Sequence, residues 1–137
     1  MGACYTTVFR VKAKDETTAA DAMRRWMHDM EDAGFARFSL DAHRAEGVVP
    51  DTIDGVIMVV LAGWRNTPFR TTGPDADGFT TYENDFEASY GWGMVLLEFA
   101  AALAPHLEDG SSFYIEPDDE YHDIVTIDGK LINRQNI

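Results

Sequence analysis

Hydrophobic residues change their spacing along this chain, and the changes predict both strands and helices. Near the start, Tyr5, Thr7, Phe9 and Val11 alternate with Thr6, Val8, Arg10 and Lys12. Apolar residues at every second position are typical of a strand with one buried face, here over residues 4–13.

The spacing then becomes helical. An apolar stripe follows with a helical period and comprises Met23, Trp26, Met27 and Met30. Asp15 or Thr17 can cap the start of this helix, and Gly34 is a typical stop signal. The stripe predicts an amphipathic helix with one face packed in the core.

The rest of the chain continues to alternate between strand and helix patterns. Further strands are predicted over residues 35–43, 56–64 and 79–90, and a second helix has its apolar stripe over residues 92–103. The run at 56–64 is apolar throughout, which favours a central strand covered on both faces. The tail from residue 111 onward predicts a three-stranded meander, with turns at residues 117–120 and 128–129.

The resulting order is β-α-β-β-β-α-β-β-β, which predicts an α+β fold. We expect residues 1–137 to form a single two-layer domain, since 137 residues suit one core. Two helices would pack on a mainly antiparallel sheet of about five to seven strands. Two β-α-β units follow one another, so the nearest named architecture is a ferredoxin-like plan with extra strands.

Composition narrows the class of protein. Apolar residues make up 45% of the chain, and no apolar run reaches the roughly 18 residues that a membrane helix needs. The single cysteine, Cys4, excludes a disulfide within the chain. The first residues do not resemble a secretory signal, so a cytoplasmic protein without membrane contact is expected.

The net charge of −13 is concentrated in one half of the chain. Residues 1–70 carry nine Lys and Arg against ten Asp and Glu, whereas residues 71–137 carry two against fourteen. Such a field repels nucleic-acid backbones and anionic lipids, which argues against direct nucleic-acid binding. It attracts cationic partners, although an acidic surface can also serve solubility alone.

The stretch IEPDDEYHDI, residues 115–124, has the composition of a metal or acid-base site. A hairpin with Asp118 and Asp119 at its tip would turn His122 to the helix side and Glu116 and Asp123 to the other side. The ligands then do not converge, so the stretch predicts a hairpin and no metal site. A two-residue turn at 128–129 would also pair Asp123 with Arg134 across two strands.

No other motif predicts catalysis or a cofactor. GPDADGF, residues 73–79, lacks the first acid and the final glutamate of a calcium loop and is interpreted as a turn. GWGMVL, from Gly91, lacks the third glycine of a dinucleotide-binding loop. No nucleophile lies in a recognised catalytic motif, so no catalytic residue, cofactor or metal is assigned, and a non-enzymatic protein is favoured.

Aromatic and charged residues occur together in and beside the segment TYENDFEASYGW, residues 81–92. This combination suits a recognition surface as well as ordinary core packing. The candidate binding residues are Trp64, Arg65, Arg70, Asp85, Glu87, Tyr90 and Trp92.

Three functional hypotheses follow from these patterns. The first is a binding module whose acidic C-terminal half docks a basic protein, as an inhibitor or immunity-type protein would. The second is a small-molecule binder or small enzyme with a pocket between the loop 64–78 and the segment 82–92. The third places function in an interface that one sequence does not reveal, and exposed sheet edges leave a homo-oligomer open.

Overall fold

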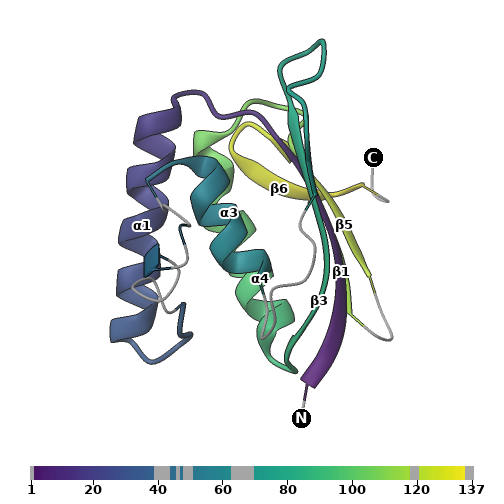
Figure 1. Ribbon diagram of the computed structural model, residues 1–137. Helices are drawn as coiled ribbons and strands as arrows, with labels where there is room; N and C mark the ends of the chain where they lie inside the picture. The colour runs from purple at the N-terminus through teal and green to yellow at the C-terminus, as the bar shows by residue number, and fades with distance from the viewer. Residues whose placement is uncertain are drawn as a thin grey trace.

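The computed structural model describes residues 2–38, 44, 45, 47, 51–62, 70–117 and 121–134. In chain order, its elements are β1 (Gly2–Val11), α1 (Glu16–Asp32), α3 (Ile53–Leu61), β2 (Arg70–Thr72), β3 (Thr80–Ser89), α4 (Trp92–Leu103), the 3₁₀ turn η1 (Ala104–His106), β4 (Ser112–Glu116), β5 (His122–Ile127) and β6 (Lys130–Asn133). Helices and sheet form two layers, with the helices on one face of the sheet (Figure 1). The predicted α+β class is confirmed.

The six strands form one antiparallel sheet in the order β2-β3-β1-β4-β5-β6. The first four strands follow the β-α-β-β-α-β order of a ferredoxin-like plan, with β1 and β3 in the middle. The strands β5 and β6 extend the sheet beyond β4, as the predicted meander requires. The central pair, β1 and β3, is in register from Gly2 opposite Ser89 to Val11 opposite Thr80.

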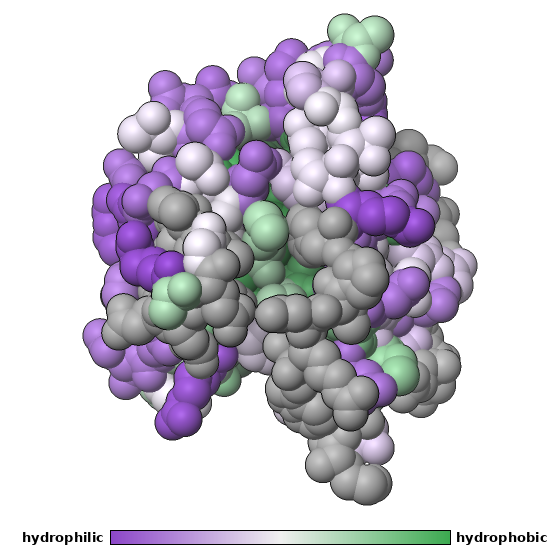
Figure 2. Space-filling view, in the orientation of Figure 1, coloured by the Kyte–Doolittle hydropathy of each residue, from purple (hydrophilic) through white to green (hydrophobic). Residues whose placement is uncertain are grey.

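The core lies between the sheet and the helices. On β1, Tyr5 and Phe9 are almost fully buried, and Phe9 packs edge-on against Phe113 of β4. The helices contribute the stripes expected from the sequence, of which Met23 and Met27 are completely buried. Figure 2 shows hydrophilic residues along α1 and hydrophobic ones where the helices meet the sheet.

The predicted helix boundaries agree with local chemistry. Asp15 caps α1, because its side chain accepts a hydrogen bond from the backbone N–H of Thr18 at 2.9 Å. After α4, Pro105 lies within η1, where the α-helix has already ended. The strands of the tail also have the predicted register, with Ile115 opposite His122 and Ile127 opposite Lys130. The predicted hairpin tip at Asp118 and Asp119 lies outside the described residues.

Two predicted strands are wrong in the part of the chain that the structure describes. The apolar run predicted as a central strand at 56–64 is instead mostly helix α3, a third helix capped by the side chain of Thr52. Its apolar residues face the core on nearly all sides, and a run without periodicity fits a buried helix as well as a buried strand.

Residues 35–38, predicted as the start of a strand, form no strand, and residues 39–43 lie outside the described residues. The backbone N–H of Phe38 donates to the carboxylate of Glu31 at 3.1 Å rather than to a neighbouring strand. The Phe38 ring packs against Trp26 and Trp92. Burial of this ring explains the apolar signal at position 38 without a strand.

Candidate functional site

The helices leave one face of the sheet uncovered, and we call this the open face (Figure 1). Burial alternates along the strands, so the residues between the buried ones define it. On β3, Tyr82, Asn84, Phe86 and Ala88 are buried toward the helices. Glu83, Asp85 and Glu87 therefore project from the open face.

Strand pairing places these carboxylates beside defined neighbours. Asp85 lies opposite Thr6 of β1, and Thr6 lies opposite Glu116 of β4. Adjacent strands are about 4.8 Å apart, so Asp85 and Glu116 are separated by about 10 Å. Glu87 lies one pair further along, opposite Cys4. Two carboxylates of β3 and one of β4 thus lie in the same region of the open face.

Two other acidic side chains among the described residues of this face, Glu83 and Asp123, form ion pairs. Arg70 contacts Glu83 at 2.8 Å, and Arg134 contacts Asp123 at 3.2 Å. The second pair is the one predicted from the hairpin register. Both are exposed pairs of the kind that add little to stability, but they remove two negative charges from the face.

The carboxylates of Asp85, Glu87 and Glu116 have no ion pair within the part of the chain that the structure describes. All three are exposed. We call these three residues the acidic triplet. Its charges are available to a cation that approaches the open face.

Two tyrosines lie beside the acidic triplet. The rings of Tyr114 and Tyr121 are stacked with their centroids 6.1 Å apart, and Tyr121 is 51% exposed. The hydroxyl of Tyr114 donates to Glu116, which raises the pKa of Tyr114, and desolvation adds to the rise. Tyr114 therefore remains a neutral donor near neutral pH. Exposed tyrosine beside charge is common in protein-binding surfaces.

The sequence-predicted binding residues do not form one cluster. Asp85 and Glu87 belong to the acidic triplet, and Arg70 lies on the neighbouring strand with Glu83. Tyr90 is exposed in the turn after β3. Trp92 lies on the helix side, where its indole N–H donates to the carbonyl of Val60 at 3.0 Å. Trp64 and Arg65 lie outside the described residues.

Sequence reasoning missed three members of this surface, Tyr114, Glu116 and Tyr121. The predicted hairpin register already turns Glu116 away from the helix side. The missing information was the pairing of β1 with both β3 and β4, which connects residues about 80 to 110 positions apart. Nothing in the local sequence signals that pairing.

The segment GPDADGF, residues 73–79, is ordered by contacts of Asp75. Asp75 in GPDADGF accepts hydrogen bonds from the backbone N–H groups of Asp77 and Phe79 and pairs with Arg10 at 2.7 Å. The bond from Phe79, and then that from Arg10, lowers the pKa of Asp75. This segment is the turn between β2 and β3, as predicted.

Among the residues that the structure describes, no group of three potential ligands is placed to hold a metal ion. Within the same residues, no helix combines the length and apolar character needed to cross a membrane. Comparisons with protein-family models, with curated proteins and with solved structures found no match.

Proposed function

We propose that this chain is a non-enzymatic binding module whose open face docks a basic protein, in the manner of an inhibitor or immunity-type protein. The observation that carries the proposal is the acidic triplet. Asp85, Glu87 and Glu116 come from two strands of the acidic half of the chain and gather, without an ion pair in the described residues, on the uncovered side of the sheet.

Charge complementarity favours a basic partner. A net charge of −13 raises the encounter rate with cationic proteins and opposes contact with nucleic acid. It also opposes a second copy of the chain at this face, since two triplets would then meet. The stacked pair Tyr114 and Tyr121 supplies the aromatic contact area that charge alone does not provide.

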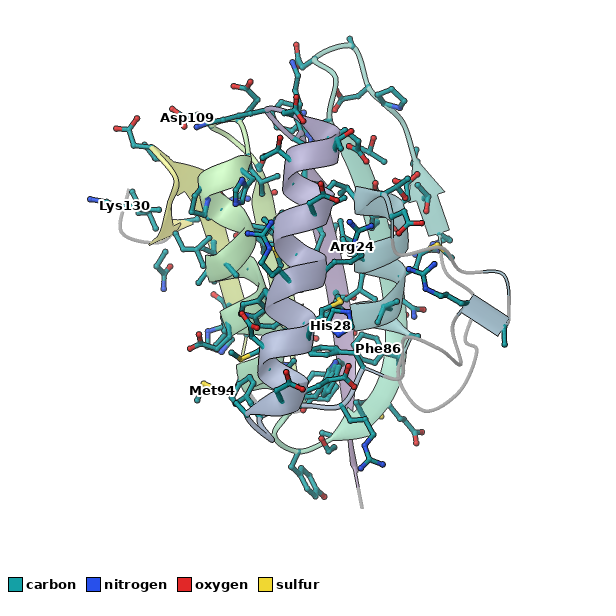
Figure 3. The ribbon with its side chains drawn as sticks, turned by 90° about the vertical axis from the view of Figure 1, so that its left-hand side faces the viewer. Arg24, His28, Phe86, Met94, Asp109 and Lys130 are labelled. Carbon is teal, nitrogen blue, oxygen red and sulfur yellow. The ribbon has the colours of Figure 1, made fainter. Side chains whose placement is uncertain are left out.

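The test compares two variants with equal loss of charge. The first neutralises the triplet through Asp85→Asn, Glu87→Gln and Glu116→Gln. The matched control neutralises three exposed acids of the helix layer through Asp29→Asn, Asp32→Asn and Glu98→Gln. Figure 3 shows that layer, with α1 in front and α3 and α4 on either side of it.

Each protein is immobilised and exposed to nuclease-treated lysate of its own host, and retained proteins are identified and rebound in pure form. We expect a basic protein to bind the wild type and the control, and to bind the triplet variant about tenfold more weakly. Binding should weaken as salt is added. Equal losses in both variants, or no retained protein at low salt, would contradict the proposal.

A second proposal is a small-molecule binder or small enzyme with a pocket between residues 64–78, predicted as a loop but containing β2, and the segment 82–92. The observation that favours it is a cleft that touches both segments, at Gly78 and at Tyr82. The cleft is lined by neither Glu87 nor Trp92. It lies instead against the first residues of α1 and α3, so the second proposal concerns that end of the molecule.

A further inference from the structure

The cleft lies where the ends of four elements meet. It has a volume of about 430 Å³, within the range of small-molecule sites. Its lining residues are Val11, Lys12, Ala13, Glu16, Ile53, Asp54, Gly78, Thr80 and Tyr82. Both α1 and α3 begin at this end of the molecule (Figure 1). The apolar part of the wall can contact methylene groups, and the polar part gathers around Tyr82.

Two carboxylates border the Tyr82 phenol. The hydroxyl of Tyr82 donates to Oδ1 of Asp54, and Oε1 of Glu16 accepts a hydrogen bond from the backbone N–H of Ile53 at 2.8 Å. Burial, Asp54 and then Glu16 all raise the pKa of Tyr82, and both carboxylates line the same cleft as Tyr82. Glu16 and Asp54 have no ion pair among the described residues.

Lys12 is the one cationic side chain among the described residues that line the cleft, and it forms no ion pair with either carboxylate. Nζ of Lys12 donates to the backbone carbonyl of Asp77 at 3.2 Å, in the turn before β3. Its side chain crosses Gly78 so closely that a Cβ at position 78 would lie 3.1 Å from Cε of Lys12. Among the described residues, the second carboxylate oxygens of Glu16 and Asp54 accept no hydrogen bond, so they are open to a ligand.

Helix starts normally attract anions, because their first N–H groups lack partners. Here the Asp15 side chain binds the N–H of Thr18, the Glu16 side chain binds that of Ile53, and the Thr52 side chain binds that of Gly55. An anion in the cleft would meet two carboxylates and would displace these contacts. A cation would meet two carboxylates whose negative charge the helix dipoles stabilise.

We infer that the cleft binds a small organic cation, a primary ammonium or guanidinium group on a short aliphatic chain. The charged group lies between Glu16 and Asp54 against Tyr82, and the chain lies along Val11, Ala13 and Ile53. This inference rests on the second proposed function and is independent of the docking of a basic protein on the open face.

The experiment is an NMR titration of the ¹⁵N-labelled protein, following the backbone amides of Lys12, Ile53 and Gly78. The probes are putrescine and agmatine, and the comparison compounds are succinate and butane-1,4-diol. We expect saturable shifts with the two cations only. Asp54→Asn and Glu16→Gln keep the hydrogen bonds to Tyr82 and Ile53 while removing charge, and each should weaken binding about tenfold.

The matched control is Asp32→Asn, an exposed acid at the far end of α1, which should leave both cations bound as in the wild type. Saturable shifts with succinate or the diol instead would keep the cleft as a binding site and overturn its preference for cations. Absence of saturable shifts with all four compounds would overturn both the site and its ligand class. Unchanged binding in the Asp54 and Glu16 variants would overturn the assignment of the charged contacts.

Discussion

At the scale of single residues, the buried polar side chains differ in whether they have a hydrogen-bond partner. The hydroxyl of Thr7 donates to the carbonyl of Asn84 at 2.9 Å, and the side-chain amide of Asn84 donates to the carbonyl of Leu61 at 2.6 Å. The hydroxyl of Thr126, on β5, has no hydrogen-bond partner among the described residues although Thr126 is fully buried. Such a group costs stability because it has lost its water without gaining a partner.

Thr126→Val should therefore stabilise the protein by about 1 kcal/mol, since valine keeps the shape and removes the unpaired hydroxyl. Thr7→Val is the matched control, and it should lower the free energy of unfolding by about 1 kcal/mol because its hydroxyl is bonded. Urea denaturation of both variants measures the two changes. A loss of stability in Thr126→Val would show that its hydroxyl has a partner.

Tyr82 gives a prediction for alkaline pH. Burial and the neighbouring charge of Asp54 raise its pKa above the ordinary value of 10.0. A raised pKa contributes stability that is present below pH 10 and is lost as the pH rises, because the unfolded chain releases the proton first. The stability difference between wild type and Tyr82→Phe should shrink above pH 10. A difference that stays constant from pH 8 to pH 11 would contradict this assignment.

At the scale of elements, the sequence predicts best where local chemistry sets the geometry. Asp128 and Gly129 fix a tight turn with positive φ at both positions, so the register of β5 and β6 follows from the sequence. Helix α3 could not be predicted in this way, because its position between the sheet and α1 buries it on nearly every side. Only tertiary packing distinguishes that helix from a strand.

The start of α3 is stabilised by a local contact as well as by tertiary packing. The side chain of Thr52 accepts a hydrogen bond from the N–H of Gly55 at 3.1 Å. Thr52→Ala should lower the free energy of unfolding by about 1 kcal/mol. Thr17→Ala, in the first turn of α1, removes a threonine that does not cap its helix and should change stability by less than about 0.5 kcal/mol. Equal effects of the two substitutions would argue against the capping role of Thr52.

The edges of the sheet bear on self-association. The edge strand β2 has three residues and begins with Arg70, and the edge strand β6 has four residues and begins with Lys130. Short edges that carry a cation oppose pairing with another sheet. A homo-oligomer remains a prediction from the sequence, and these short edges offer few backbone N–H and C=O groups for pairing with a second sheet.

At the scale of the whole molecule, the sequence predicts the excess of negative charge but not its placement. The acidic half of the chain supplies every member of the acidic triplet, and composition alone shows that excess. Its location on the open face depends on β1 lying between β3 and β4. That location is a consequence of the fold. The sequence therefore predicts an excess of negative charge, but it does not predict which acidic residues lie next to one another.

The same charge predicts how stability responds to salt. With a net charge of −13, repulsion within the folded chain acts over distances of about 10 Å or more, which salt screens. Raising NaCl from about 0.02 M to about 0.3 M should therefore raise the melting temperature by roughly 3 to 6 °C. The triplet variant should melt at a higher temperature in low salt and respond less to added NaCl, because three mutually repelling charges are gone.

The ion pairs of Arg70 and Arg134 are weakened by the same screening, so a melting temperature that falls with salt would mean that attraction outweighs repulsion. In that case the negative charges of the acidic triplet would not be in net repulsion. Electrostatic attraction of a basic partner to the open face would then have no physical basis.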